Sequence, residues 1–152
     1  MKFHIKRAKS PLKGTVVYRS EEFAFDTVPS PSDGHTTIVL DDINLEVDEG
    51  QRVIGIWGLC PHTRWKEHSL TPPEATNGEL FVRTETPLHH GVARRLTPVG
   101  QHLDTFVDRT SGWIKVNHLP QPKTAVRVLE NAIVELDDAC EVSALWIKPG
   151  NS

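Results

Sequence analysis

Proline and glycine interrupt this sequence so often that long helices have little room to form. There are eleven prolines and ten glycines among 152 residues. A proline inside a helix removes a hydrogen bond, and a glycine weakens the helix through its conformational freedom. The stretches between these residues are mostly short, alternating in polarity and rich in β-branched or aromatic side chains, which favours strands. We predict strands at residues 3–6, 15–19, 23–27, 36–40, 43–47, 52–58, 80–83, 113–117, 125–129, 132–136 and 141–147.

One segment has the spacing of a short helix. Thr97 can cap its first turn, Pro98 suits the first helical position, and Gly112 can end it. Apolar residues recur at positions 99, 103, 106 and 107, which would share one face of a helix. We therefore predict a helix here and mainly β structure elsewhere.

Residues 39–57 resemble residues 128–146 without a gap, at an offset of 89 residues. The identical pairs are Val39/Val128, Leu40/Leu129, Glu46/Glu135, Asp48/Asp137, Val53/Val142 and Trp57/Trp146. Upstream, the Pro-x-Pro segment at 29–31 corresponds to the one at 120–122 with a two-residue shift. We interpret these similarities as an internal repeat with units at about 20–58 and 111–147, separated by an insertion at 59–110. The alternative is that hairpins with acidic turns look alike for conformational reasons.

The repeat predicts a single domain, 1–152, with a mainly β fold. We expect a sandwich or partly open barrel built from two similar β units, with one short helix in the connecting insertion. The strand at 52–58 is apolar on both faces, so it should be central and covered twice. The predicted core residues are Leu45, Val47, Val53, Ile54, Ile56, Trp57, Val134, Leu136, Val142, Leu145 and Trp146.

Charge and apolar content argue against several classes of function. Lys and Arg number 17 against 20 for Asp and Glu, whereas a nucleic-acid binder usually has a basic excess. No window approaches the roughly 18 consecutive apolar residues of a membrane-spanning helix. The basic first residues lack a following apolar run, so we expect no secretory signal and a cytoplasmic location. Cys60 and Cys140 should be free thiols there, although a single bridge between them remains open.

The insertion at 59–110 contains five of the eight histidines and one cysteine. Sulfur and imidazole ligands suit zinc, although the spacing matches no standard zinc site. The alternative is that these histidines lie at the surface or form hydrogen bonds within loops. We therefore expect no cofactor. If the set does bind a metal, zinc is the metal that it would take. The candidate metal ligands are Cys60, His62, His89, His90 and His102, with His118 as a further candidate.

The same insertion is locally basic, and arginine and tryptophan are typical anchors of interfaces. Interleaved glutamates nearly cancel the charge, so a solvated surface with salt bridges is the alternative. The candidate interaction residues are Arg64, Trp65, Arg83, Arg94 and Arg95.

No phosphate-binding loop, nucleophile elbow or two-histidine zinc helix is present. We therefore predict a non-enzymatic binding domain of the bacterial inhibitor, immunity or adaptor type, with a protein partner and no nucleic acid or membrane. The sequence also leaves open whether the protein forms a homodimer. The alternatives are a metal-dependent enzyme or metal-binding protein that uses the histidine-rich insertion, and a β domain that binds a small ligand or carbohydrate between its two units.

Overall fold

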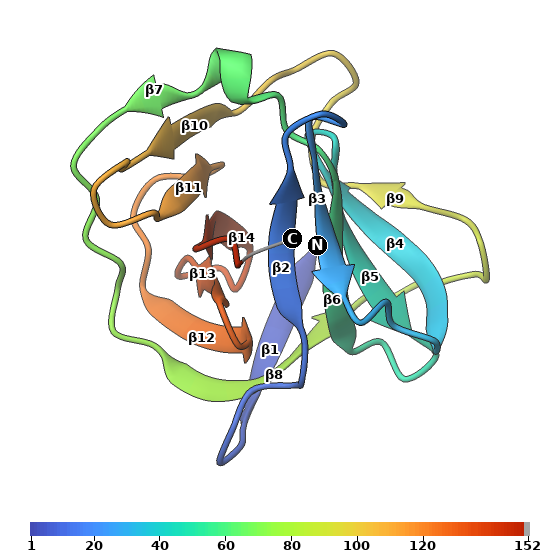
Figure 1. The fold of residues 1–152 in the computed structure, drawn as a ribbon. Coiled ribbons are helices and arrows are strands. Elements are labelled where there is room, and N and C mark those ends of the chain that lie inside the picture. The colour runs from blue at the N-terminus through green and yellow to red at the C-terminus, as the bar shows by residue number, and fades with distance from the viewer. Residues whose placement is uncertain (151–152) are drawn as a thin grey trace.

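The structure, a computed structural model, describes residues 1–150 and consists almost entirely of strands (Figure 1). Its one helical element within these residues is a 3-10 turn, η1 (His62–Arg64), and no helix in this range is long and apolar enough to cross a membrane. The strands are β1 (Lys2–Arg7), β2 (Thr15–Arg19), β3 (Ala24–Val28), β4 (Gly34–Leu40), β5 (Ile43–Asp48), β6 (Val53–Leu59), β7 (Lys66–Glu67), β8 (Thr76–Arg83), β9 (Arg94–Arg95), β10 (Asp104–Val107), β11 (Ile114–Asn117), β12 (Thr124–Leu129), β13 (Ala132–Leu136) and β14 (Val142–Ile147).

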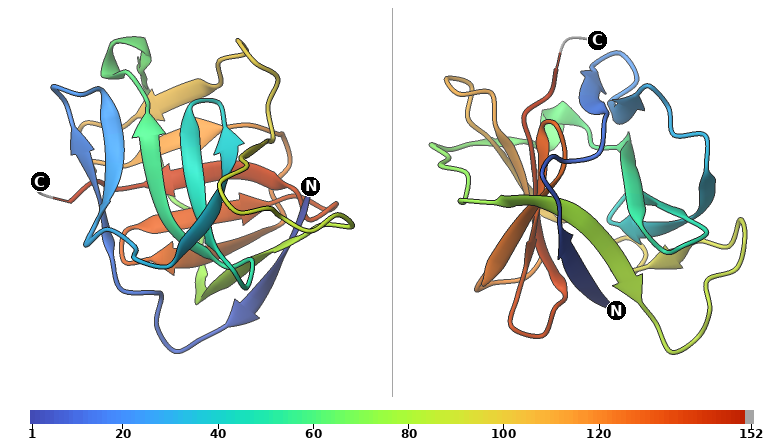
Figure 2. Two further views of the ribbon diagram at one scale, coloured as in Figure 1. Left: turned by 90° about the vertical axis from the view of Figure 1, so that its right-hand side faces the viewer. Right: turned by 90° about the horizontal axis from the view of Figure 1, so that it is seen from below.

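The strands form two mixed sheets that face each other. One has eight strands in the order β1-β8-β12-β13-β14-β11-β10-β7, and the other has six in the order β2-β3-β6-β5-β4-β9. The strands of one sheet cross behind those of the other (Figure 2, left). The predicted mainly β, sandwich-like fold is therefore confirmed. Each of the eleven predicted strands overlaps an observed one, and the three unpredicted strands, β7, β9 and β10, lie in the insertion.

The helix predicted between Thr97 and Gly112 is wrong. Residues 104–107 form β10, which pairs antiparallel with β11. Gly100 has a φ of 82°, outside the helical region. Val99 is 83% exposed whereas Val107 is 5% exposed, so the four apolar positions do not share one buried face. Backbone pairing with β11 outweighs a local pattern that favoured a helix. The helical turn of the insertion lies instead at η1.

Two four-stranded units have the same strand order, β3-β6-β5-β4 in one sheet and β11-β14-β13-β12 in the other. The registers of β3, β5 and β6 agree with those of β11, β13 and β14 at the offset of 89 residues. Strands β4 and β12 differ by one residue, because Thr37 lies opposite Glu46 and Ala125 lies opposite Glu135. Glu46 lies opposite Gly55 on β6, and Glu135 lies opposite Ala144 on β14. In both hairpins a register shift follows the glutamate.

The turns of the two hairpins also match in detail. The carboxylate of Asp48 accepts a hydrogen bond from the backbone N–H four residues later, at 2.9 Å, and Asp137 does the same at 3.0 Å. The residue before that donor is Gln51 in one turn and Cys140 in the other, with φ values of 68° and 62°. This left-handed conformation is uncommon outside glycine, so its recurrence at equivalent positions is a specific similarity.

The correspondence extends upstream of the predicted units, to β2 and β10. Val16 on β2 pairs with Thr27 on β3, and Thr105 on β10 pairs with Val116 on β11, again 89 residues apart. Strand β10 therefore occupies in its sheet the position that β2 occupies in the other. The common ancestry of the two units stays a prediction.

The inner faces of both sheets supply one apolar core. Nine of the eleven predicted core residues are buried. The prediction is wrong for Trp57, which is 43% exposed, and Ile54 is only half-buried. Strand β6 is central in its sheet, as expected, but within residues 1–150 it is not fully covered on its outer side, where the Trp57 ring is exposed. The largest fully buried side chains include Phe3, Phe25, Leu45, Ile56, Leu80, Leu136 and Leu145.

The eight-stranded sheet is covered on its outer side by the chain itself. Residues 68–75, which we call the strap, run from β7 to β8 along that side (Figure 1). Leu70 and Ala75 of the strap, together with Trp113, pack on the buried cluster around Trp146. The Asp108 carboxylate accepts the backbone N–H of Leu70 at 3.0 Å and so holds the start of the strap. All six residues of β14 are consequently buried.

Replacing Asp108 by Asn should loosen the strap in a pH-dependent way. Backbone N–H donors, first from Leu70 and then from Ser111, hold the pKa of the Asp108 carboxyl below its usual value. A lowered folded-state pKa gives stabilisation that is complete above the unfolded-state pKa and is lost as the pH falls through the folded-state value. Wild-type protein should therefore lose more stability than Asp108→Asn between neutral pH and about pH 3, as measured by urea midpoints. Parallel losses in both proteins would contradict this role.

Candidate functional site

A tryptophan and a glutamate form the same hydrogen bond in both sheets. The indole Nε1 of Trp57 donates to Oε2 of Glu46 at 2.8 Å. The indole of Trp146 donates to the Glu135 carboxylate in the equivalent place. Each glutamate lies on the first strand of its hairpin, β5 or β13, and each tryptophan lies on the return strand, β6 or β14, at a diagonally neighbouring register position. The pair is therefore part of the architecture of both units.

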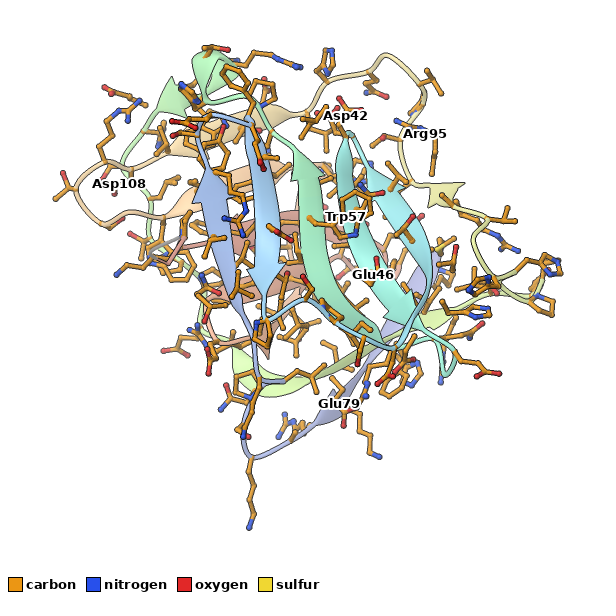
Figure 3. All side chains as sticks on the ribbon, turned by 45° about the vertical axis from the view of Figure 1, so that its right-hand side comes forward. Asp42, Glu46, Trp57, Glu79, Arg95 and Asp108 are labelled. Carbon is orange, nitrogen blue, oxygen red and sulfur yellow. The ribbon has the colours of Figure 1, made fainter. Side chains whose placement is uncertain are left out.

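The surroundings of the two pairs differ. Trp146 and Glu135 are each only 4% exposed. Trp113 packs edge-on against Trp146 with ring centroids 6.2 Å apart, and Lys115 Nζ lies 5.1 Å from the Trp146 ring centroid. Trp57, in contrast, stands with Glu46 in the middle of an open sheet face (Figure 3). One pair is covered by the chain, and the other meets solvent.

We call the outward-facing residues Thr37, Asn44, Glu46 and Trp57 of β4, β5 and β6 the Trp57 face. A Cβ at position 34 would collide with the Glu46 carboxylate, so glycine there makes room for the glutamate that holds the indole. A hollow of about 240 Å³ lies beside the ring, and its lining residues are Gly34, His35, Thr36, Thr37, Glu46, Trp57 and Gly91.

The insertion supplies one wall of this hollow. The N–H of Gly91 donates to the carbonyl of His35 at 2.8 Å, and the hydroxyl of Thr36 donates to the carbonyl of Val92 at 2.7 Å. These bonds fasten the loop between β8 and β9 to β4. The hollow is thus bordered by a part of the chain that has no counterpart in the repeat.

Equivalent positions around the two tryptophans carry different side chains. On the Trp57 side they are small or polar, and on the Trp146 side they are larger or more apolar. An exposed aromatic ring with polar neighbours is typical of the centre of a contact surface. The pairs at the offset of 89 residues are Ala24/Trp113, Asp26/Lys115 and Asn44/Ile133.

Two of the predicted metal ligands, Cys60 and His62, lie at η1 beside Tyr18. The Tyr18 hydroxyl donates to the carbonyl of Cys60 at 2.8 Å and lies 3.3 Å from Nδ1 of His62. Burial raises the pKa of the Cys60 thiol. Because a thiol must ionise to act as a zinc ligand or nucleophile, this environment disfavours both roles.

The other predicted ligands are dispersed. His89 and His90 are exposed in the loop after β8, and the ring of His90 lies 5.3 Å from that of His35. Nδ1 of His118 is 3.0 Å from the carbonyl of Val142 in the other sheet.

His102 is the one predicted ligand found in a group of metal-binding type. Within residues 1–150, the single set of three such side chains with ligand atoms inside 4.8 Å of one another is Asp41, Asp42 and His102. The Asp41 carboxylate already accepts the N–H of Leu103 at 2.9 Å, and its own N–H donates to the Thr97 hydroxyl at 2.8 Å. These bonds fasten a loop, which accounts for the group without a metal.

Two predicted interaction residues, Arg94 and Arg95, border the Trp57 face, because β9 pairs with β4. Their guanidinium groups bond to backbone carbonyls. Arg94 donates to Pro87 at 2.9 Å, and Arg95, visible beside Asp42 in Figure 3, donates to Asp41 at 2.9 Å. Both arginines therefore hold loops in place.

The remaining interaction residues lie in two other places. Trp65 is half-buried, with its ring centroid 4.7 Å from that of Tyr18, and Arg64 is exposed next to it. Arg83 lies on β8 in the other sheet and donates to Nδ1 of His4 at 3.2 Å. The five predicted residues do not form one patch.

No protein-family model matches this sequence, and a search of the curated proteins finds no match. The geometry of the site therefore carries the functional argument. Sequence reasoning missed the Trp57 face because both tryptophans end similar apolar strands. The signal that separates them is Asn44, a polar residue opposite Trp57, where Ile133 lies opposite Trp146.

The two tryptophans should differ in their contribution to stability. Trp146→Ala removes a buried ring and leaves the Glu135 carboxylate without its donor, so it should cost about 3–5 kcal/mol. Trp57→Ala should cost about 1 kcal/mol, because much of that ring already meets water. Chemical denaturation of both variants measures the difference, and equal losses would contradict the difference in burial.

The two cysteines should react at different rates with a thiol reagent such as Ellman's reagent. Cys140 is exposed, whereas Cys60 is buried with a raised pKa. Wild-type protein should show a fast and a slow phase, about tenfold or more apart, and Cys140→Ser should remove the fast one. In denaturant both thiols should react fast. A rapid reaction of Cys60 in the folded Cys140→Ser variant would contradict the burial of this thiol.

Proposed function

We propose that this protein is a non-enzymatic binding domain with a protein partner, and that the Trp57 face is its contact surface. The supporting observation is that Trp57 is 43% exposed while the equivalent Trp146 is covered by the chain itself. Exposing a large aromatic ring to water is unfavourable, and contact with a partner would relieve this cost. The small and polar side chains around the ring would form the rim of such a contact.

This proposal moves the contact surface from the insertion to β4, β5 and β6, with the loop at Gly91 as its border. The size of the domain fits the inhibitor, immunity or adaptor type expected from the sequence, of the kind found in bacteria. The free thiols of Cys60 and Cys140 support a reducing compartment such as the cytoplasm. The matching registers support a duplication, after which one unit kept its own cover and the other presents its outer face.

Affinity capture with matched variants tests the contact surface. Wild-type protein, Trp57→Ser and Val99→Ser serve as baits in an extract of the source cells. Val99 is the control because it is apolar and 83% exposed, but it lies in a loop outside the Trp57 face. A specific partner should be retained by the wild type and by Val99→Ser and lost with Trp57→Ser. A partner retained equally by all three baits would contradict the proposed surface.

A further inference from the structure

The strap shows what kind of chain covers a tryptophan–glutamate pair in this fold. Residues 68–75 run without a turn, contain Pro72 and Pro73, and bring Leu70 and Ala75 onto the cluster around Trp146. Prolines favour an extended backbone and remove donors that would otherwise need partners. The strap is held at its start, where the N–H groups at positions 68 and 70 bond to the end of β10.

The outer side of the six-stranded sheet is only partly covered along the equivalent path. Pro31 lies over Gly55, the counterpart of Ala144, whereas the Trp57 ring is 43% exposed. Arg19, at the end of β2, occupies the position of Asp108, which holds the strap. Ala24 stands where Trp113 packs in the other sheet, so less of the chain's own apolar surface adjoins Trp57. A segment from outside could therefore pack on the accessible Trp57 ring.

Charge indicates what that segment should carry. Lys115 supplies a cation over the Trp146 ring, and its equivalent on the other sheet is Asp26. Within the described residues no lysine or arginine lies over the Trp57 ring. Asp26 already pairs with Arg19 at 3.3 Å, which leaves the half-buried Glu46, beside the Trp57 indole, as the carboxylate that a partner's cation would meet. A cation placed there would gain both charge pairing and attraction to the indole.

We propose that the partner covers the Trp57 face with an extended segment that carries an aliphatic side chain for the Trp57 ring and a lysine or arginine for Glu46. This inference rests on the proposed function. It adds the chemistry of the partner, for which the strap over Trp146 is the internal precedent.

The probe is a synthetic peptide with the sequence of residues 66–76 and the substitution Glu74→Lys, which turns its net charge from negative to positive. It is titrated into the ¹⁵N-labelled whole protein, whose four tryptophans give four indole N–H signals. The Trp57 signal is assigned from its loss in Trp57→Phe. The Trp57→Phe variant also serves as the control for specific binding.

The peptide should shift the Trp57 indole signal saturably and leave the other three unchanged. Adding Leu70→Asp to the peptide should weaken binding about tenfold or more, because it removes a buried aliphatic contact. The peptide with the original Glu74 should bind more weakly, and that difference should shrink as salt is added.

Other outcomes overturn the inference and separate it from the proposed function. If no peptide shifts Trp57 but captured partners still depend on Trp57, the extended segment is wrong and the contact surface stands. If both experiments fail, both proposals fall. If cellohexaose shifts the Trp57 signal and the peptides do not, the ligand is a carbohydrate. If the signal moves with protein concentration alone, the occupant is a second copy of this chain.

Discussion

The hydrogen bond from a tryptophan indole to a glutamate on the neighbouring strand stands near the centre of each sheet, and its surroundings decide what that sheet can do. An indole N–H or a carboxylate buried without a partner costs free energy. The pair removes this cost, so Glu135 can be 4% exposed beneath the strap. On the open sheet the same bond holds the Trp57 side chain in place. A ring fixed before binding loses less conformational freedom when a partner arrives.

The inner faces of both sheets share one core, so the outer faces are where the units differ. The eight-stranded sheet has its outer side closed by Leu70, Ala75 and Trp113. The six-stranded sheet buries one face and leaves the other accessible, an arrangement common for antiparallel strands. A scaffold of this kind separates stability from recognition, because substitutions around Trp57 change little of the common core.

The strands were largely predictable from the sequence, because alternating polarity and frequent breakers specify short strands and their turns. The equivalent hairpins could also be aligned, and their registers agree at the same offset. The predicted helix at 97–112 is wrong because antiparallel pairing with the next strand, β11, decided the structure of 104–107. Following the offset further upstream, from Val16 to Thr105, would have indicated a strand.

The candidate site was harder to predict, since the patterns of β6 and β14 do not reveal which tryptophan is covered. Cover at Trp146 comes from residues far away in the sequence, namely the strap and Trp113. The dispersed histidines and arginines of the insertion illustrate the same limit. Their spacing along the sequence did not indicate that Arg94 and His102 would each bond to a different nearby loop, Arg94 at Pro87 and His102 at Asp41.

Solvent paramagnetic relaxation of the tryptophan ring protons, induced by a soluble gadolinium chelate, tests most directly whether one pair is open and the other covered. The ring protons of Trp57 should relax several-fold faster than those of Trp146, in keeping with their exposed fractions of 43% and 4%. Similar relaxation at the two rings would contradict the asymmetry on which the contact surface depends.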